Sequence, residues 1–155
     1  MLTEYKDFSI FTLTYSGEYT GTDEEVVIPE GVNIISSDAF KDNTSVKSVV
    51  MPNTVTYIDS RAFRGCSSLE RVVLSDNLKY IKPQAFEDCI SLSQIELPSS
   101  LKAIGVTSIG RSSFYRVDRK NKLTIQAPKG SYAIKYAKKM HFKYEYVEEN
   151  PYVNG

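Results

Sequence analysis

One stretch of the chain reads LERVVLSDNLKYIKPQAFEDCIS, residues 69–91, and its pattern recurs before and after at a spacing of 23 residues. Within it, Val72 and Leu74 alternate with positions that face the other way, which is typical of a short strand with one buried side. A second apolar segment follows, and then the compact stretch 83–86, which places Phe86 inward. We therefore predict that each repeat is one coil containing two strand-like segments and a short helical or 3₁₀ turn.

The apolar positions of this coil stay in register over three to four copies. One coil cannot bury its own apolar side, whereas stacked coils bury each other, so a solenoid requires such columns. The columns are Ile28, Met51, Leu74 and Leu97; Val32, Val55, Leu78 and Leu101; Ile35, Ile58, Ile81 and Ile104; Ala39, Ala62 and Ala85; Phe40, Phe63 and Phe86; Val46, Leu69 and Leu92; and Val49, Val72 and Ile95. The sequence thus predicts a mainly β solenoid.

The repeat resembles the BspA-like class of leucine-rich repeats, most clearly in residues 95–105 and in the Ala-Phe pair followed by Cys at 62–66 and 85–89. The resemblance extends over about residues 22–128. It implies a leucine-rich-repeat solenoid, and it implies a surface or secreted location, because members of this family look like bacterial surface proteins used in adhesion and cell contact. It names no ligand, since a repeat scaffold carries its function on variable surface positions.

Both ends of the chain depart from the repeat, as the terminal coils of an open solenoid must. The N-terminal cap is predicted to be a β-hairpin that leads into a strand at Glu25–Ile28, and the C-terminal cap a helix with Ser131 as N-cap, followed by a strand at Phe142–Val147. The predicted single domain, 1–155, divides into an N-terminal cap at 1–24, about four repeats at 25–128, a C-terminal cap at 129–147 and a loose tail at 148–155.

The fourth repeat is irregular. Ser108 and Ile109 replace the Ala-Phe pair, and the next strand is delayed, because alignment of Leu97 with Ile125 requires 28 residues. The extra residues lie within 110–121, a basic segment that suggests either an anion or polysaccharide contact or, the reading we favour, a solvated loop. Its cationic residues and the one that follows are Arg111, Arg116, Arg119, Lys120 and Lys122.

The composition and the hydropathy of the chain narrow the range of possible partners and locations. Lysine plus arginine and aspartate plus glutamate both number 19, a balance that gives no reason to expect nucleic acid as a partner. The N-terminal residues show no signal peptide, and no stretch has the length and hydropathy of a membrane span. Eleven tyrosines and no tryptophan suit wet interfaces.

The sequence contains few residues that suggest catalysis or metal binding. Cys66 and Cys89 occupy one column, so a disulfide is conceivable, but we favour two small buried thiols that satisfy turn backbone. The single histidine, His141, lies in the C-terminal cap, and no motif places an acid, base or nucleophile beside it. We expect no catalytic, cofactor-binding or metal-binding residues, and hence no enzyme.

The best functional surface is the outer face of the first strand of each coil. Three valines in one column suggest a contact stripe, with the alternative that valine simply suits a strand. The predicted outward columns are Val27, Val50, Val73, Glu96 and Thr124; Glu25, Ser48, Arg71, Gln94 and Lys122; and Glu24, Lys47, Glu70, Ser93 and Asn121. The candidate interaction residues are Lys47, Ser48, Val50, Glu70, Arg71, Val73, Gln94 and Glu96, with a separate aromatic pair at Tyr57 and Tyr80.

Three hypotheses follow. The first is a monomeric module that binds a protein partner through this face. The second is a structural or self-assembling surface unit that uses exposed strand edges. The third is a glycan-binding module that uses tyrosines and the basic insertion.

Overall fold

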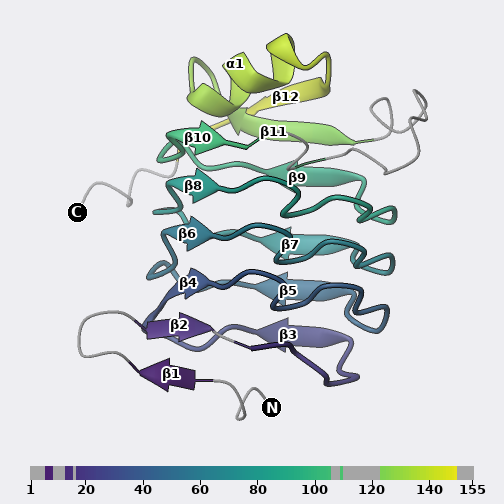
Figure 1. Ribbon diagram of the computed structural model, residues 1–155. Coiled ribbons are helices and arrows are strands. Elements are labelled where there is room, and N and C mark those ends of the chain that lie inside the picture. Colours follow the sequence, from purple (N-terminus) through teal and green to yellow (C-terminus); the bar gives the residue numbers. More distant parts are fainter. Residues whose placement is uncertain (1–5, 9–12, 16, 106–108, 110–122, 150–155) are drawn as a thin grey trace.

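The protein is described by a computed structural model, which covers residues 6–8, 13–15, 17–105, 109 and 123–149. The chain winds into a β-solenoid of about five turns with a repeat of about 23 residues, mostly strand, and ends in one short helix. Figure 1 shows the turns stacked from the N-terminal end to a C-terminal cap. The solenoid predicted from the spacing of apolar residues is therefore confirmed.

Each turn contributes one strand to each of two sides. The first side carries β3 (Glu25–Val27), β5 (Ser48–Val50), β7 (Arg71–Val73), β9 (Gln94–Glu96) and β11 (Thr124–Pro128). The second side carries β2 (Leu13–Tyr15), β4 (Val32–Ile35), β6 (Tyr57–Ile58), β8 (Tyr80–Ile81) and β10 (Ala103–Ile104). All neighbouring strands of these two sets that pair do so in parallel, as successive coils of a solenoid must.

The predicted apolar columns form the core. A stack of aromatic rings runs through it: the Phe40 and Phe63 ring centroids lie 4.9 Å apart, and those of Phe63 and Phe86 lie 5.1 Å apart. All three phenylalanines are buried. Ile109 continues this column through a parallel bridge with Phe86.

The compact segment that carries each phenylalanine consists of turns rather than the predicted helical or 3₁₀ turn. Gln84 and Asp88 have φ angles of 63° and 60°. The residues at the same two positions of the earlier coils also have positive φ angles, between 58° and 74°. Left-handed residues at two fixed positions interrupt a right-handed helix after one bond. At one of these positions Gly65 has a φ of 74°, and a Cβ there would collide with the Asp42 carboxylate.

The N-terminal cap contains the predicted hairpin, formed by β1 (Lys6–Phe8) and β2 in antiparallel register. Its second strand joins β4 on the second side and not β3 on the first. Tyr19 then takes the place of a phenylalanine, because its ring centroid lies 5.1 Å from that of Phe40. The segment before Glu25 therefore already supplies part of a coil.

The C-terminal cap contains the predicted helix and strand, α1 (Tyr132–Lys139) and β12 (Lys143–Val147). The Ser131 side chain accepts a hydrogen bond from the Ile134 amide at 3.3 Å, as expected for an N-cap. After the helix, His141 adopts a φ of 59°, and the Phe142 amide donates to the Ala137 carbonyl. This is a Schellman ending, with histidine at the position that usually holds glycine.

The residues of β12 do not alternate between buried and exposed, so neither face of this strand is buried. Its first four residues are exposed and only Val147 is partly buried, because β12 pairs with β11 at the end of the stack and no further coil of the described residues covers it. The predicted tail at 148–155 lies outside the described residues beyond Glu149, and the basic insertion with Arg111, Arg116, Arg119, Lys120 and Lys122 lies wholly outside them.

Candidate functional site

The three valines of the predicted stripe stand side by side on the first side of the solenoid. Val27 pairs with Val50, and Val50 pairs with Val73, in parallel register. Val27 is 62% exposed, whereas Val50 and Val73 are half-buried between their neighbours. The stripe is a partly exposed apolar line that crosses β3, β5 and β7.

The ladder of this side is interrupted after β7. The strands form one sheet of β3, β5 and β7 and another of β9, β11 and β12, and no strand pairing joins β7 to β9 in the described part of the chain. The two strands nevertheless remain neighbours, with Cα atoms within 8 Å of each other. On the second side the ladder runs without a break from β2 to β10. The interruption is therefore local to one face.

Backbone hydrogen bonds mark the same break. In the closed part, the amides of Glu70 and Arg71 both donate to the Lys47 carbonyl, at 2.8 and 3.1 Å, and the Met51 amide donates to the Val73 carbonyl at 2.9 Å. The corresponding amide one coil further on, that of Leu74, makes no such bond to β9 among the described residues.

The Val72 backbone completes this unpaired edge. Successive residues of a parallel strand point their amide and carbonyl groups to alternate sides. Since Arg71 and Val73 bond toward β5, the N–H and C=O of Val72 face β9. Backbone donors and acceptors thus line the break.

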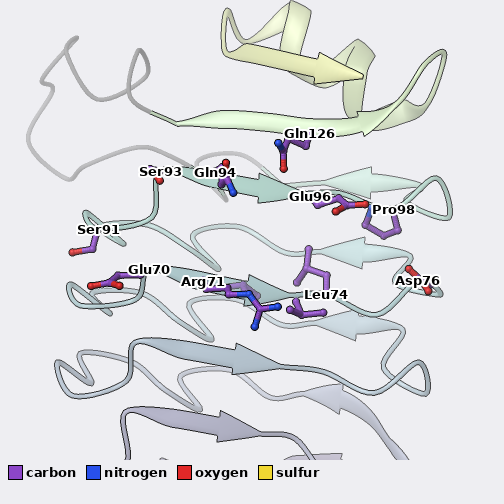
Figure 2. A pocket seen from close by; sticks show the side chains of 12 residues that line it. Glu70, Arg71, Leu74, Asp76, Ser91, Ser93, Gln94, Glu96, Pro98 and Gln126 are labelled. Carbon is purple, nitrogen blue, oxygen red and sulfur yellow. The ribbon is translucent and has the colours of Figure 1, made fainter. Parts of the chain in front are cut away.

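A cleft of about 800 Å³ occupies this position, and we call it the β7–β9 slot. Figure 2 shows Glu70, Ser91 and Ser93 toward one end, Asp76, Glu96 and Pro98 toward the other, and Arg71 and Gln94 between them. The floor includes the core residues Val72 and Leu74, which keep 7% and 8% of their surface exposed. The slot therefore joins an apolar floor to a polar rim.

The charges of the rim are unequal. Glu70, Asp76 and Glu96 contribute three carboxylates against the one guanidinium of Arg71. Among the described residues, no hydrogen bond or ion pair engages the side chains of Arg71 or Glu96. Lys47, which directly precedes β5, pairs with Glu24 at 2.8 Å. That contact raises the pKa of Lys47 above its usual value. The slot is thus an acidic cleft beside a locally neutral surface.

The structure divides the ten candidate interaction residues into three groups. Five line the slot, namely Glu70, Arg71, Val73, Gln94 and Glu96. Lys47, Ser48 and Val50 lie beside it on and next to β5. Tyr57 and Tyr80 pair on the second side, with ring centroids 5.9 Å apart and the Lys82 Nζ 5.9 Å from the Tyr57 ring centroid.

The predicted register of the last repeat strand was wrong by two residues. Gln126, not Thr124, pairs with Glu96, and Thr124, not Lys122, pairs with Gln94. A shift of two residues preserves which side chains face inward, so apolar alternation cannot detect it. Sequence reasoning consequently missed Gln126, which lines the slot.

The cysteines act as turn donors. The Cys66 Sγ donates to the Phe40 carbonyl at 2.9 Å, and the Cys89 Sγ donates to the Phe63 carbonyl at 3.1 Å. Both are free thiols. Burial raises the pKa of Cys66 to about 12 and raises that of Cys89 well above its usual value. In the first coil Asn43 serves the same turn, because its amide donates to the Gly21 carbonyl at 3.0 Å.

The described residues contain no group of three or more His, Cys, Asp or Glu side chains arranged to hold a metal ion. No helix among these residues has the length and apolar character needed to cross a bilayer.

The stacked coils with a continuous apolar and aromatic core define a leucine-rich-repeat protein. The model of the family described as "BspA type Leucine rich repeat region" matches residues 15–140 in six copies. The chain therefore belongs to this family. Repeats of this family are generally binding units without enzymatic activity.

Several solved structures are similar to this one. A leucine-rich-repeat protein of T. pallidum has 26% sequence identity and a TM-score of 0.59, with coverage of 74% of this chain and 62% of that one. One from Bacteroides ovatus has 26% identity and a TM-score of 0.64, with coverage of 94% and 39%. A leucine-rich cell surface protein of Faecalibacterium prausnitzii has a TM-score of 0.70 at 22% identity, which shows the fold alone, with coverage of 94% and 38%.

The chain spans less than two thirds of each of these three proteins. A search of curated proteins gives no match.

Proposed function

We propose that this chain is a non-enzymatic module that binds a protein partner through the first side of its solenoid. The observation that carries the proposal is the β7–β9 slot, which opens at the end of the partly exposed valine stripe. Binding surfaces commonly combine an apolar center with polar groups that fix orientation. The stripe supplies the former and the rim of the slot the latter.

The same proposal places the protein at a bacterial cell surface or in secreted form, working as a monomer. The similarity to a leucine-rich cell surface protein supports the location. Membership in a family of binding repeats supports a protein as partner.

A competition between two triple variants tests the proposal. The stripe variant carries Val27→Lys, Val50→Lys and Val73→Lys. The control carries three lysines in one column of the turns, in place of Thr44, Ser67 and Ile90, none of which is buried. Both variants gain three positive charges, so they differ only in the face that is altered.

Each protein is immobilised and exposed to bacterial culture supernatant and lysate, and bound proteins are quantified by mass spectrometry. The proposal expects a partner that the parent and the control retain and the stripe variant loses, with loss verified by calorimetry on the purified partner. Circular dichroism verifies that each variant is folded. Equal retention by the stripe variant and the control would refute a binding site on this side.

A structural or self-assembling role is the second candidate, and the outer edge of β12 favours it. No described strand pairs with that edge, and Tyr144 and Tyr146 beside it are 38% and 51% exposed. Edge strands of this kind associate between chains. Light scattering over a wide range of concentration tests this role, and a species that stays monomeric at the highest concentration would exclude it.

A further inference from the structure

We propose that the β7–β9 slot recognises an extended, arginine-bearing peptide segment, which lies along the mouth of the slot and places a guanidinium at each acidic end. This inference rests on the proposed function and names the chemistry of the partner. Four features of the slot support it: its width, its charge, its unpaired backbone and its floor.

The width decides what can enter. Paired strands lie about 4.8 Å apart, so an inserted strand would need its neighbours about 9.6 Å apart. Cα atoms of β7 and β9 approach within 8 Å. The slot therefore admits side chains and not a peptide backbone, and the backbone must lie along its mouth.

The charge decides which side chains are favoured. The rim carries carboxylates at both ends, Glu70 at one and Asp76 with Glu96 at the other, as Figure 2 shows. Along a strand, the residues from Glu70 to Val73 span about 10 Å at 3.3 Å each. In an extended peptide, residues four positions apart are about 13 Å apart and point to the same face, so two arginines at that spacing can reach both acidic ends.

The unpaired backbone favours arginine over lysine. The Val72 carbonyl faces β9 and receives no bond from it, and arginine brings five N–H donors in a planar fork, whereas the lysine ammonium has three donors at a single point. The apolar stem of arginine also suits a floor that exposes Val72 and Leu74. Arg71 lies between the acidic ends and is positioned to meet a carboxylate or carbonyl of the same partner.

The test uses a fluorescent peptide with two arginines about four residues apart and small β-forming residues between them. The matched probe replaces both arginines with citrulline, whose planar ureido group keeps the shape but carries no charge and has a carbonyl oxygen in place of one nitrogen. A third probe replaces them with lysine. Binding to the full chain is measured by fluorescence polarisation at low and high salt.

The expected order of affinity is arginine, then lysine, then citrulline, with a gap of at least about fivefold between arginine and citrulline that shrinks in high salt. Glu96→Gln and Glu70→Gln should each weaken the arginine peptide by about fivefold. Glu25→Gln is the control, because Glu25 is an exposed carboxylate of the same side in the closed part of the ladder. It should change affinity by less than about twofold.

Hydrogen exchange supplies a second readout that does not depend on charge. Binding should exclude water from the slot, which should slow exchange of the Val72 and Leu74 amides and leave that of the Val49 and Met51 amides unchanged. Ser93→Phe, at an exposed position of the rim, should block the peptide while the protein stays folded.

The outcomes separate this inference from the proposed function. Equal binding of the arginine and citrulline peptides, or an equal effect of Glu25→Gln and Glu96→Gln, would overturn the inference. A partner that is lost by the stripe variant yet retained by Ser93→Phe and Glu96→Gln would also overturn it while leaving the proposed function intact. Failure of the proposed function would appear instead as retention by the stripe variant.

Discussion

The aromatic stack should make Phe63 one of the most costly side chains to remove. Its ring lies between those of Phe40 and Phe86, with centroids 4.9 and 5.1 Å away and interplanar angles of 11° and 2°. The side chain is fully buried. Phe63→Ala removes the burial of a large ring and leaves a cavity that two flanking coils cannot both fill, at a cost of about 3–5 kcal/mol.

That cost is a large part of the total. At about 0.05–0.15 kcal/mol per residue, a chain of 155 residues has a free energy of unfolding of about 8–23 kcal/mol. With a urea slope of about 2 kcal/mol per molar, the variant should unfold about 1.5–2.5 M earlier than the parent. Circular dichroism and tyrosine fluorescence follow the transition, since the chain has no tryptophan.

Tyr57→Ala provides the control within the same coil. Tyr57 is half-buried on the second side and contacts Tyr80 and Lys82, so its removal should cost about 1 kcal/mol. A loss below about 1.5 kcal/mol for Phe63→Ala, or a loss equal to that of Tyr57→Ala, would show that the coils relax around the missing ring. The stack would then not be the close-packed center of the core.

Three further outcomes are expected. His141→Gly should raise the melting temperature by about 1–3 °C, because glycine adopts the left-handed φ of this helix ending without strain, and a lower value in a thermal melt would contradict this. Cys66 and Cys89 should react slowly with iodoacetamide in the native protein and rapidly in urea, because burial raises the pKa of both thiols and only the thiolate reacts; equal rates would disprove it. Tyr19 has a pKa raised to about 12 by burial and by its hydrogen bond to Asp23, so its contribution to stability is present below about pH 10 and is lost as the pH rises from there to about 12. Urea midpoints across this range should therefore fall less in Tyr19→Phe than in the parent, and an identical fall in both would count against that assignment.

The core of this protein could be predicted from the sequence because it is a repeated local pattern. Every coil must place the same apolar residues against its neighbours, so a column such as Phe40, Phe63 and Phe86 is visible as a fixed spacing. The thiol positions followed from the same spacing, and the structure shows both thiols bonded to turn carbonyls, with Cys66 buried and Cys89 half-buried. The start of the helix at Ser131 followed from capping chemistry, which is also local.

The start of the first coil and the register of the last strand were not visible in the same way. Tyr19 joins the aromatic stack 21 residues before Phe40, so a search for the regular spacing passes over it. Gln126 lies beside Glu96 because of a two-residue shift that changes no side chain's facing. Both depend on how much chain lies between coils, which the alternation of side chains does not record.

The sequence by itself determined the repeat, the core and which side chains of the strands face outward. Only the tertiary structure decided where that side is open. The columns of β7 and β9 continue the same pattern as those of β5 and β7, yet one pair of strands is hydrogen-bonded and the other is not. Side-chain periodicity reports which residues turn inward, whereas the slot arises from the separation of two backbones, and every residue carries the same backbone donors and acceptors whatever its side chain.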